Sequence, residues 1–430
     1  MKQKLIVLSA DAMVYEDLAY LETLPNYQKY LAGGVRVEKV RSIYPTITYP
    51  CHATMASGVY PATHGIPGNL NFEPGNLHPS WRWFYDSLKF KESIFKSAKL
   101  AGYSTAAVYW PTTGNNPYID YLIDEYWTQS PEDTILEAYA RSGSQPEVLE
   151  IIKNNMEGVV LRSHPNSDKF AMRCAIDMLR KFNPDVFLIH PANIDGLRHK
   201  TGVFSEAVRE EIRRTDEWIG QIMQAVEDNG CADRTNFVLV SDHGQMNIQR
   251  IISINVFLAD RGYITYHEDG SLKDWRAYCL SGGHCVQVYM KDKNDKQLYQ
   301  ELYKMFSSMV EDGIYGISRV LTREDFLKEH LDGDFSFTLE SDGYTSFSDR
   351  WLRPIIFDRC NSDDYRFGRA THGYLPHKGP QPVFLAKGPG FKENVVLPEG
   401  RLIDEAPTYA ALLGVEIPGT EGRAMTELLK

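Results

Sequence analysis

The chain lacks any apolar run long enough to cross a membrane. A spanning helix needs about 18 to 20 consecutive apolar residues, and runs such as Leu5–Leu8 and Phe237–Val240 are far shorter. The N-terminus has a charged start, but the apolar run that follows Lys4 is too short for a secretory signal. We therefore expect no membrane span and a cytoplasmic location.

An excess of positive charge is also missing. The sequence has 46 Lys and Arg residues against 57 Asp and Glu residues, which gives a formal net charge of −11. Proteins bind nucleic-acid duplexes through broad basic surfaces, because every phosphate carries a negative charge. This balance argues against a dedicated binder of nucleic-acid duplexes, although it is compatible with a small anionic substrate held by metal ions. It leaves the oligomeric state open.

The six cysteines show neither a CxxC pair nor a regular spacing. A disulfide framework or a cysteine-rich metal site would need such a pattern. We expect reduced thiols, including Cys279 and Cys285, which are close enough in sequence for a bridge.

What the sequence does contain is the alternation of strands and helices typical of an α/β protein. With 430 residues, 43% of them hydrophobic, the chain can bury a large core. Apolar runs alternate with helix-like segments, which predicts a largely parallel central sheet covered by helices on both faces. The strand candidates are 104–109, 186–190, 237–240 and 383–386, and the clearest helices are 205–229 and 168–182.

Two long stretches interrupt this alternation. The stretch from about 112 to 165 is rich in Tyr, Pro, Asn and Ser, and indicates a lid-like excursion over the active face. The segment 250–368 is too long for a connection and has strand and helix signals of its own. We therefore predict a catalytic core of residues 1–249 and 369–430 with an inserted cap subdomain of residues 250–368.

Two short motifs each place a carboxylate and an imidazole directly after an apolar run that predicts a buried strand. They are Asp195-Gly196-Leu197-Arg198-His199, after 186–189, and Ser241-Asp242-His243-Gly244, after 237–240. Asp11 follows the first predicted strand, and His372 lies in a glycine-containing turn. Ligands gather beyond the carboxyl ends of strands in open α/β sheets. These side chains are enough for two zinc-like ions, each with three protein ligands and an open position.

A candidate nucleophile lies where extended chain runs into a predicted helix. Thr48 precedes Pro50, a residue type that the first turn of a helix tolerates. The N-terminus of a helix favours an anion, and a threonine hydroxyl becomes a nucleophile when a metal or a base removes its proton. An ion held by Asp11, Asp242 and His243 could do so. A threonine taken alone is more often a simple helix cap.

Together these elements resemble the nucleotide pyrophosphatase/phosphodiesterase branch of the alkaline phosphatase superfamily. The motifs that carry the resemblance are, in order, Tyr44–His52, Gly58–Asn69, Asp195 with His199, Asp242–Gly244 and Gly368–Gly373. The resemblance covers about 1–111, 185–247 and 368–430, and it implies an alkaline-phosphatase-like core. Cys51 departs from the family pattern, in which Asn commonly stands at this position. Its surroundings also lack the Cys-x-Pro-x-Arg motif of a sulfatase.

The resemblance implies two divalent ions, with zinc the expected metal. The positions that match the ligands of the first ion are Asp11, Thr48, Asp242 and His243. Those that match the ligands of the second ion are Asp195, His199 and His372.

It also implies roles around the phosphorus. Thr48 matches the nucleophile, and Asn69 matches the side chain that donates to a phosphoryl oxygen, helped by the backbone N–H near Tyr49. The ring of Tyr49 matches the group that stacks against a nucleobase or another organic part of the substrate. Further aromatic residues, among them Trp81 and Trp127, are expected near the mouth of the site.

Other histidines are expected to support the site rather than to react. His52 and His64 belong to the signature, where an imidazole can tie turns together through both nitrogens. His190, at the end of a predicted strand, is expected to be a core residue or a neighbour of the metal ligands. His284 and His377 could line the pocket.

The expected function is hydrolysis of phosphodiester or nucleotide pyrophosphate bonds by two zinc ions through a phospho-threonine intermediate. The substrate would be a small phosphate ester such as a nucleotide. A phosphonoacetate hydrolase-like enzyme and a phosphomonoesterase are alternatives on the same core, with Lys378, Arg198 and Arg369 as the cations near the ligands in sequence. A catalytically silent metal-binding protein is the remaining alternative.

Overall fold

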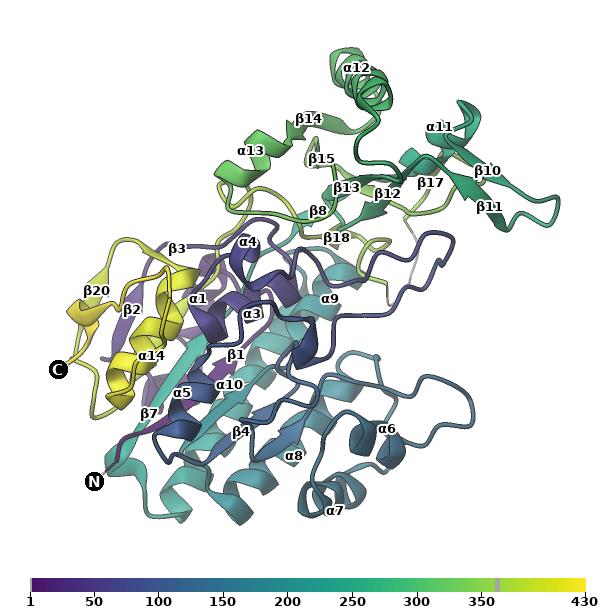
Figure 1. Ribbon diagram of the computed structural model, residues 1–430. Helices are drawn as coiled ribbons and strands as arrows, with labels where there is room; N and C mark the ends of the chain where they lie inside the picture. Colours follow the sequence, from purple (N-terminus) through teal and green to yellow (C-terminus); the bar gives the residue numbers. More distant parts are fainter. Residues whose placement is uncertain (1, 360–363) are drawn as a thin grey trace.

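The computed structural model describes residues 2–359 and 364–430, and its largest element is a central sheet of eight strands (Figure 1). In sheet order the strands are β20 (Val395–Leu397), β2 (Val35–Val37), β19 (Phe384–Lys387), β7 (Thr235–Val240), β1 (Lys4–Ser9), β6 (Val186–Ile189), β4 (Thr105–Val108) and β5 (Tyr121–Ile123). Within this sheet, β19 alone runs antiparallel to its neighbours. The predicted largely parallel α/β sheet is confirmed.

Both faces of the sheet are buried, because successive side chains of a strand point to opposite faces. In β1, Ile6 and Leu8 pack into one core cluster, and Leu5 and Val7 pack into another. The helices that contribute to the first cluster are α1 (Leu18–Leu21), α2 (Pro25–Tyr30), α6 (Ile135–Arg141), α7 (Pro146–Asn155), α8 (Asn166–Phe182), α9 (Asn193–Thr201) and α10 (Glu206–Asp228). Those that contribute to the second are α3 (Thr48–Ser57), α5 (Ile94–Leu100) and α14 (Glu405–Leu413).

The two helices predicted most clearly from the sequence are present. In α10 the Ser205 hydroxyl caps the first turn by accepting the N–H of Val208 at 3.2 Å, and Gly230 follows in the left-handed region. α8 begins two residues before the predicted Asp168 and ends at the predicted Phe182. The Ser205 cap and the apolar stripe therefore located α10, and the Asn183-Pro184 pair located the end of α8.

The excursion from about 112 to 165 contributes more to the core than its sequence indicated. Its strand β5 forms the edge of the central sheet, paired in parallel with β4. Helices α6 and α7 follow and pack onto the same face as α8. A strand of only three residues gives too little alternation to be recognised in a sequence.

Residues 250–357 build separate sheets (green in Figure 1). One sheet has the order β12 (Ala277–Ser281), β13 (Cys285–Met290), β15 (Phe337–Ser341) and β14 (Ile317–Thr322), and another has the order β16 (Thr345–Phe347), β9 (Arg250–Ile252) and β17 (Ile356–Phe357). A hairpin joins β10 (Ile264–Tyr266) to β11 (Leu272–Trp275), and the helices are α11 (Ile254–Asp260), α12 (Lys296–Asp312) and α13 (Arg323–Lys328). This part has a hydrophobic cluster of its own. Its boundaries as a cap subdomain stay a prediction.

Short pairings join this cap to the core. β8 (Met246–Asn247) pairs with β18 (Ala370–Thr371) where the chain leaves the core and returns to it. Phe72, from the loop after the short helix α4 (Pro61–His64), stacks on Tyr289 of β13 with ring centroids 3.6 Å apart. Within the core itself, a separate short pair joins β3 (Val40–Arg41) to β21 (Gly400–Arg401).

The five cysteines within the described part of the chain are free and buried: Cys51, Cys174, Cys231, Cys279 and Cys285. Cys360 lies outside the described residues. Cys51 lies in α3, where it packs in the core. Across the described residues, no helix is both long and apolar enough to cross a membrane.

Candidate active site

The carboxyl ends of three neighbouring strands bring the predicted ligands together. Asp11 follows β1, α9 (Asn193–Thr201) follows β6, and a loop with further ligands follows β7. Two clusters result, and within each the ligand atoms lie within 4.8 Å of one another. The first metal cluster is Asp11, Asp242 and His243, and the second metal cluster is Asp195, His199 and His372.

The first metal cluster contains two buried carboxylates that face each other with few donors. Nε2 of His243 lies 3.1 Å from Asp242 Oδ2 and 3.6 Å from Asp11 Oδ1, and neither of these oxygens has a hydrogen-bond partner. Burial, followed by the charge of Asp195, raises the pKa of Asp11 well above its ordinary range. Burial and Asp11 do the same to the pKa of Asp242. Two uncompensated carboxylates in a buried site call for a cation.

In the second metal cluster the imidazoles are in the form that binds a metal. Nδ1 of His199 donates to the backbone oxygen of Ala370 at 2.7 Å, so the lone pair of Nε2 is free. Burial, together with the neighbouring His243, holds the pKa of His372 well below its ordinary value, which keeps the ring neutral. Asp195 Oδ2 lies 3.1 Å from Nε2 of His199, so a carboxylate oxygen and an imidazole nitrogen lie side by side for one ion.

The two metal clusters contact each other through one histidine of each. The rings of His243 and His372, one from each cluster, are stacked with centroids 4.2 Å apart. Each cluster supplies nitrogen and carboxylate oxygen donors, the set that zinc prefers, and three protein ligands leave a position open for a substrate. The unpartnered buried oxygens and nitrogens fit two divalent ions. The assignment of each residue as a ligand stays a prediction.

Thr48 is the first residue of α3, directly after its N-cap, Ile47. Its hydroxyl oxygen lies 3.2 Å from Nε2 of His243. The side chain lines a cavity of about 60 Å³ that Asp11 and the second metal cluster also line, which we call the nucleophile pocket. The sequence therefore located the candidate nucleophile at the correct end of the helix and beside the first metal cluster.

Asn69 also lines the nucleophile pocket, but its contacts differ in part from expectation. Its side-chain oxygen accepts the backbone N–H of Tyr49 at 2.9 Å. We expected this backbone N–H to donate to a phosphoryl oxygen, but it already donates to Asn69. The side-chain nitrogen of Asn69 donates to no described residue, so it remains available as the predicted donor.

The position of Tyr49 does not support its predicted stacking on the substrate, which stays a prediction. Its ring is fully buried and does not line the nucleophile pocket. Trp81 covers it, with ring centroids 5.3 Å apart at an angle of 62°. The aromatic side chains that do line the pocket are Trp81 and Tyr365, and Tyr365 stacks on His372 at 5.0 Å.

Several histidines support the site as expected. His52 contacts the backbone oxygen of Thr48 and the hydroxyl of Ser9, both at 2.9 Å, so it ties α3 to β1. Nε2 of His190 lies 3.0 Å from Asp11 Oδ2, and its Nδ1 lies 2.9 Å from the backbone oxygen of Tyr109. His190 therefore orients a predicted ligand.

Two other histidines do not line the nucleophile pocket. His284 is buried beside Ser341, and His377 is exposed. His64 is buried, and its Nε2 lies 3.1 Å from the hydroxyl oxygen of Thr54, which agrees with the expected structural role.

Sequence reasoning missed Glu125, which lines the nucleophile pocket and follows β5. Burial raises the pKa of its carboxyl group to about 7, and its Oε2 has no hydrogen-bond partner. Had β5 been recognised as a strand, its carboxyl end would have pointed to Glu125 by the rule that located Asp11.

The three cations that the sequence analysis named for a monoester substrate do not contact the nucleophile pocket. Arg198 is fully buried, donates to the backbone oxygen of Ala12 at 3.1 Å and pairs with Asp17. Lys378 pairs with Glu340 at 3.2 Å, and Arg369 is exposed. None of the three lines the nucleophile pocket.

The fold and the two clusters define an α/β protein of the alkaline-phosphatase-like type with a candidate two-metal site. Residues 5–374 match the family model described as type I phosphodiesterase / nucleotide pyrophosphatase, so the chain belongs to this family. The family resemblance seen in the sequence is confirmed.

Curated relatives are similar over most of this chain. The alignment with ectonucleotide pyrophosphatase/phosphodiesterase family member 3 of Rattus norvegicus is 454 residues long at 23% identity, and it covers 99% of this chain and 44% of the relative. Venom phosphodiesterase CdcPDE of Crotalus durissus collilineatus is 23% identical over 402 residues, which cover 87% of this chain and 40% of the relative. The chain thus spans less than half the length of these relatives.

Solved structures show the same fold. Murine ectonucleotide pyrophosphatase/phosphodiesterase 5, as an inactive variant in complex with AMP, matches with a TM-score of 0.65 at 20% identity, over 100% of both chains. The human counterpart matches with a TM-score of 0.65 at 18% identity, again over 100% of both chains. These matches support the alkaline-phosphatase-like fold of the core.

Proposed function

We propose that this protein hydrolyses phosphodiester or nucleotide pyrophosphate bonds, with Thr48 as the nucleophile and two zinc ions as cofactors. The observation that carries the proposal is the position of the Thr48 hydroxyl, 3.2 Å from His243 and in one pocket with Asp11 and the second metal cluster. Membership of the family supports the reaction class, and the related structure with AMP supports a nucleotide as substrate.

The ions would be held by the two metal clusters, and they would lower the pKa of the Thr48 hydroxyl and offset the charge of the phosphoryl oxygens. Thr48 Oγ then attacks phosphorus, the bond from phosphorus to the leaving oxygen breaks, and the leaving group departs with the electron pair. A phospho-threonine results. Water next attacks the same phosphorus, Thr48 Oγ leaves, and the hydroxyl regains a proton.

The protein's own residues position these steps. α3 aims its N-terminal end at the phosphoryl group, where the helix dipole favours negative charge. The side-chain nitrogen of Asn69 can donate to a non-bridging oxygen, because its oxygen is held by Tyr49 N–H. His190 keeps the carboxylate of Asp11 in orientation.

A preference for diesters over monoesters is supported by the absence of an arginine among the described residues that line the nucleophile pocket, where Lys200 is the cation present. A monoester carries an additional charge, which a planar arginine would bind well. Arg198 is engaged with Asp17, Lys378 with Glu340, and Arg369 is exposed. Phosphonoacetate would need a cation for its carboxylate in the same way.

A substrate panel tests the proposal. The zinc-loaded protein is assayed with thymidine 5′-(4-nitrophenyl phosphate), 4-nitrophenyl phosphate and phosphonoacetate. The proposal predicts the highest kcat/KM for the diester. A higher value for the monoester or for phosphonoacetate would reassign the substrate, and no turnover of any of them would favour a silent metal-binding protein.

A further inference from the structure

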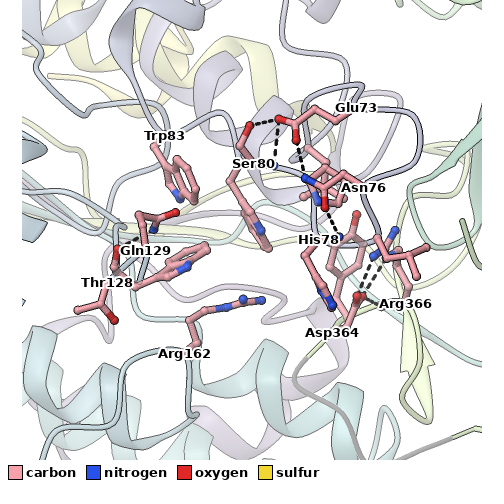
Figure 2. Close-up of a pocket in the computed structure, with 16 residues that line it drawn as sticks. Glu73, Asn76, His78, Ser80, Trp83, Thr128, Gln129, Arg162, Asp364 and Arg366 are labelled. Carbon is pink, nitrogen blue, oxygen red and sulfur yellow. Dashed lines mark hydrogen bonds and ion pairs between the residues drawn. The ribbon is translucent and has the colours of Figure 1, made fainter. Parts of the chain in front are cut away.

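A larger cavity, of about 320 Å³, adjoins the nucleophile pocket. Residues of the loop 70–81, of the excursion and of the segment 364–366 line it, and we call it the outer pocket (Figure 2). Trp81 and Tyr365 line both cavities, so these two side chains form the border between them. A substituent on a phosphorus atom next to Thr48 reaches the outer pocket by passing them.

The outer pocket adjoins the second metal cluster through Tyr365. Thr48 is beside the first metal cluster, 3.2 Å from His243. Tyr365, at the border, stacks on His372 of the second metal cluster with ring planes 8° apart. Displacement at phosphorus is in line, so the leaving group emerges opposite Thr48. Because Tyr365 connects the second metal cluster to the outer pocket, we place the leaving group on this side, past Tyr365.

The carboxylates that line the outer pocket already have donors. Glu73 accepts the side-chain nitrogen of Asn76 at 2.7 Å and the backbone N–H of Ser80 at 3.3 Å. Asp364 accepts two nitrogens of Arg366, at 2.9 and 2.8 Å. Their charges are therefore stabilised within the protein, and neither needs a cationic ligand.

Arg162 differs from the other charged residues of this lining. Its guanidinium carbon lies 4.6 Å from the ring centroid of Trp127 and 5.7 Å from that of Trp81, and it donates no hydrogen bond to a described residue. Figure 2 shows the side chain reaching into the outer pocket toward the side where Asp364 and Arg366 lie. Two tryptophans hold the guanidinium in place while its N–H groups stay free for a ligand.

The backbone at Arg162 is held in an uncommon conformation. Its φ of +61° lies in the left-handed region, which a side chain other than glycine adopts only at some cost. The surrounding chain holds this conformation and places the arginine at the mouth of the pocket. Strained residues of this kind gather at ligand-binding sites.

We propose that Arg162 is a specificity-determining residue that binds an anionic group, phosphoryl or carboxyl, on the leaving part of the substrate. This inference rests on the proposed phosphodiesterase function. A guanidinium can donate two parallel N–H groups to the oxygens of either group. Neutral polar side chains of Ser80, Thr128 and Gln129 line the same cavity and can bind the rest of the leaving part.

Three substrates that share one nucleoside test this. Thymidine 5′-(4-nitrophenyl phosphate) has a leaving group without a second anion, thymidine 5′-triphosphate releases pyrophosphate, and thymidine 5′-(4-carboxyphenyl phosphate) releases a carboxylate-bearing phenol. The readout is the kcat/KM of each anionic substrate divided by that of the nitrophenyl ester. We expect Arg162→Gln to lower this ratio by about 10- to 100-fold, the loss expected for hydrogen bonds to a charged group.

The two anionic substrates distinguish the ligand. A loss for the triphosphate alone assigns a phosphoryl group, and a loss for the carboxyphenyl ester alone assigns a carboxyl group. Arg180→Gln, which removes an exposed arginine of α8 and makes the same change in net charge, should leave both ratios within about twofold. Arg162→Lys keeps the charge without the planar fork, so it should give a partial loss and serves if the Gln variant does not fold.

Unchanged ratios in both substrates would overturn the inference. So would an equal loss on all three substrates at an unchanged melting temperature, because Arg162 would then only hold the lid. A wild-type protein inactive on all three would instead overturn the proposed function, so the two failures are distinguishable.

Discussion

The hydroxyl oxygen of Thr48 lies 3.2 Å from Nε2 of His243, which joins the start of α3 to the first metal cluster. The two residues come from separate elements, since α3 begins at Thr48 and His243 follows β7. Removing the hydroxyl therefore leaves the three carboxylate and imidazole ligands of the cluster in place. The nucleophile and the metal site can be tested independently.

Thr48→Ala should abolish most turnover without loss of the ions. Covalent catalysis is removed, and the electrostatic part of the site remains, so kcat for thymidine 5′-(4-nitrophenyl phosphate) should fall by roughly three orders of magnitude or more. Metal content by mass spectrometry should stay at the wild-type value. Thr23→Ala, at an exposed threonine that does not line the nucleophile pocket, is the matched control. Kinetics within tenfold of wild type would reduce Thr48 to a structural residue of the helix start.

His190→Gln should weaken metal binding at the first cluster selectively. His190 contacts Asp11 at 3.0 Å, and the loss of such a supporting partner typically lowers metal affinity by about 10- to 100-fold. Competition with a zinc chelator measures the two affinities. His267→Gln, at an exposed histidine, is the control. An unchanged affinity, or a loss confined to the other ion, would show that His190 does not orient Asp11 for binding.

The stability of the protein should fall as the pH rises through the titration of Glu340. Burial raises the pKa of this carboxyl group to about 7, although Lys378 at 3.2 Å opposes the shift. In the unfolded chain the group titrates near its ordinary value of about 4.3. Between these values the folded state holds the proton that the unfolded state releases, so the free energy of unfolding decreases by up to roughly 3 kcal/mol.

Urea unfolding at several pH values between 4 and 8 checks this. Glu340→Gln cannot titrate and should show a smaller decline, the remainder coming from other buried carboxyl groups such as Glu125, whereas Glu324→Gln, at an exposed carboxylate, should retain the full decline. A decline of equal size in wild type and Glu340→Gln would assign the pH dependence to other groups.

Much of the site could be predicted because its ligands follow long apolar strands. Asp11 and Asp242 are each the second residue after a strand of six residues that is buried throughout. Parallel neighbours end at the same edge of the sheet, so sequence distance is no obstacle to their meeting. α10 was predictable for a similar reason, since its apolar stripe and its Ser205 cap are local signals.

The aromatic side chains around the nucleophile pocket could not be predicted in the same way. Whether Tyr49 faces a substrate depends on Trp81, which comes from a loop without regular structure and covers its ring. Tyr365 comes from the far end of the insertion. It contacts Trp81 only in the folded molecule, where the two ring centroids lie 6.3 Å apart. Packing between distant loops leaves no period in the sequence.

Zinc titration of the metal-free protein tests the central claim most directly. The protein is stripped with a chelator, zinc is added back in measured equivalents, and the turnover of thymidine 5′-(4-nitrophenyl phosphate) is followed at each step. We predict little turnover without metal and a rise that ends at about two equivalents, because each cluster has the ligands to hold one ion. Full turnover by the stripped protein, or a rise complete at one equivalent, would contradict a two-metal site built on these clusters.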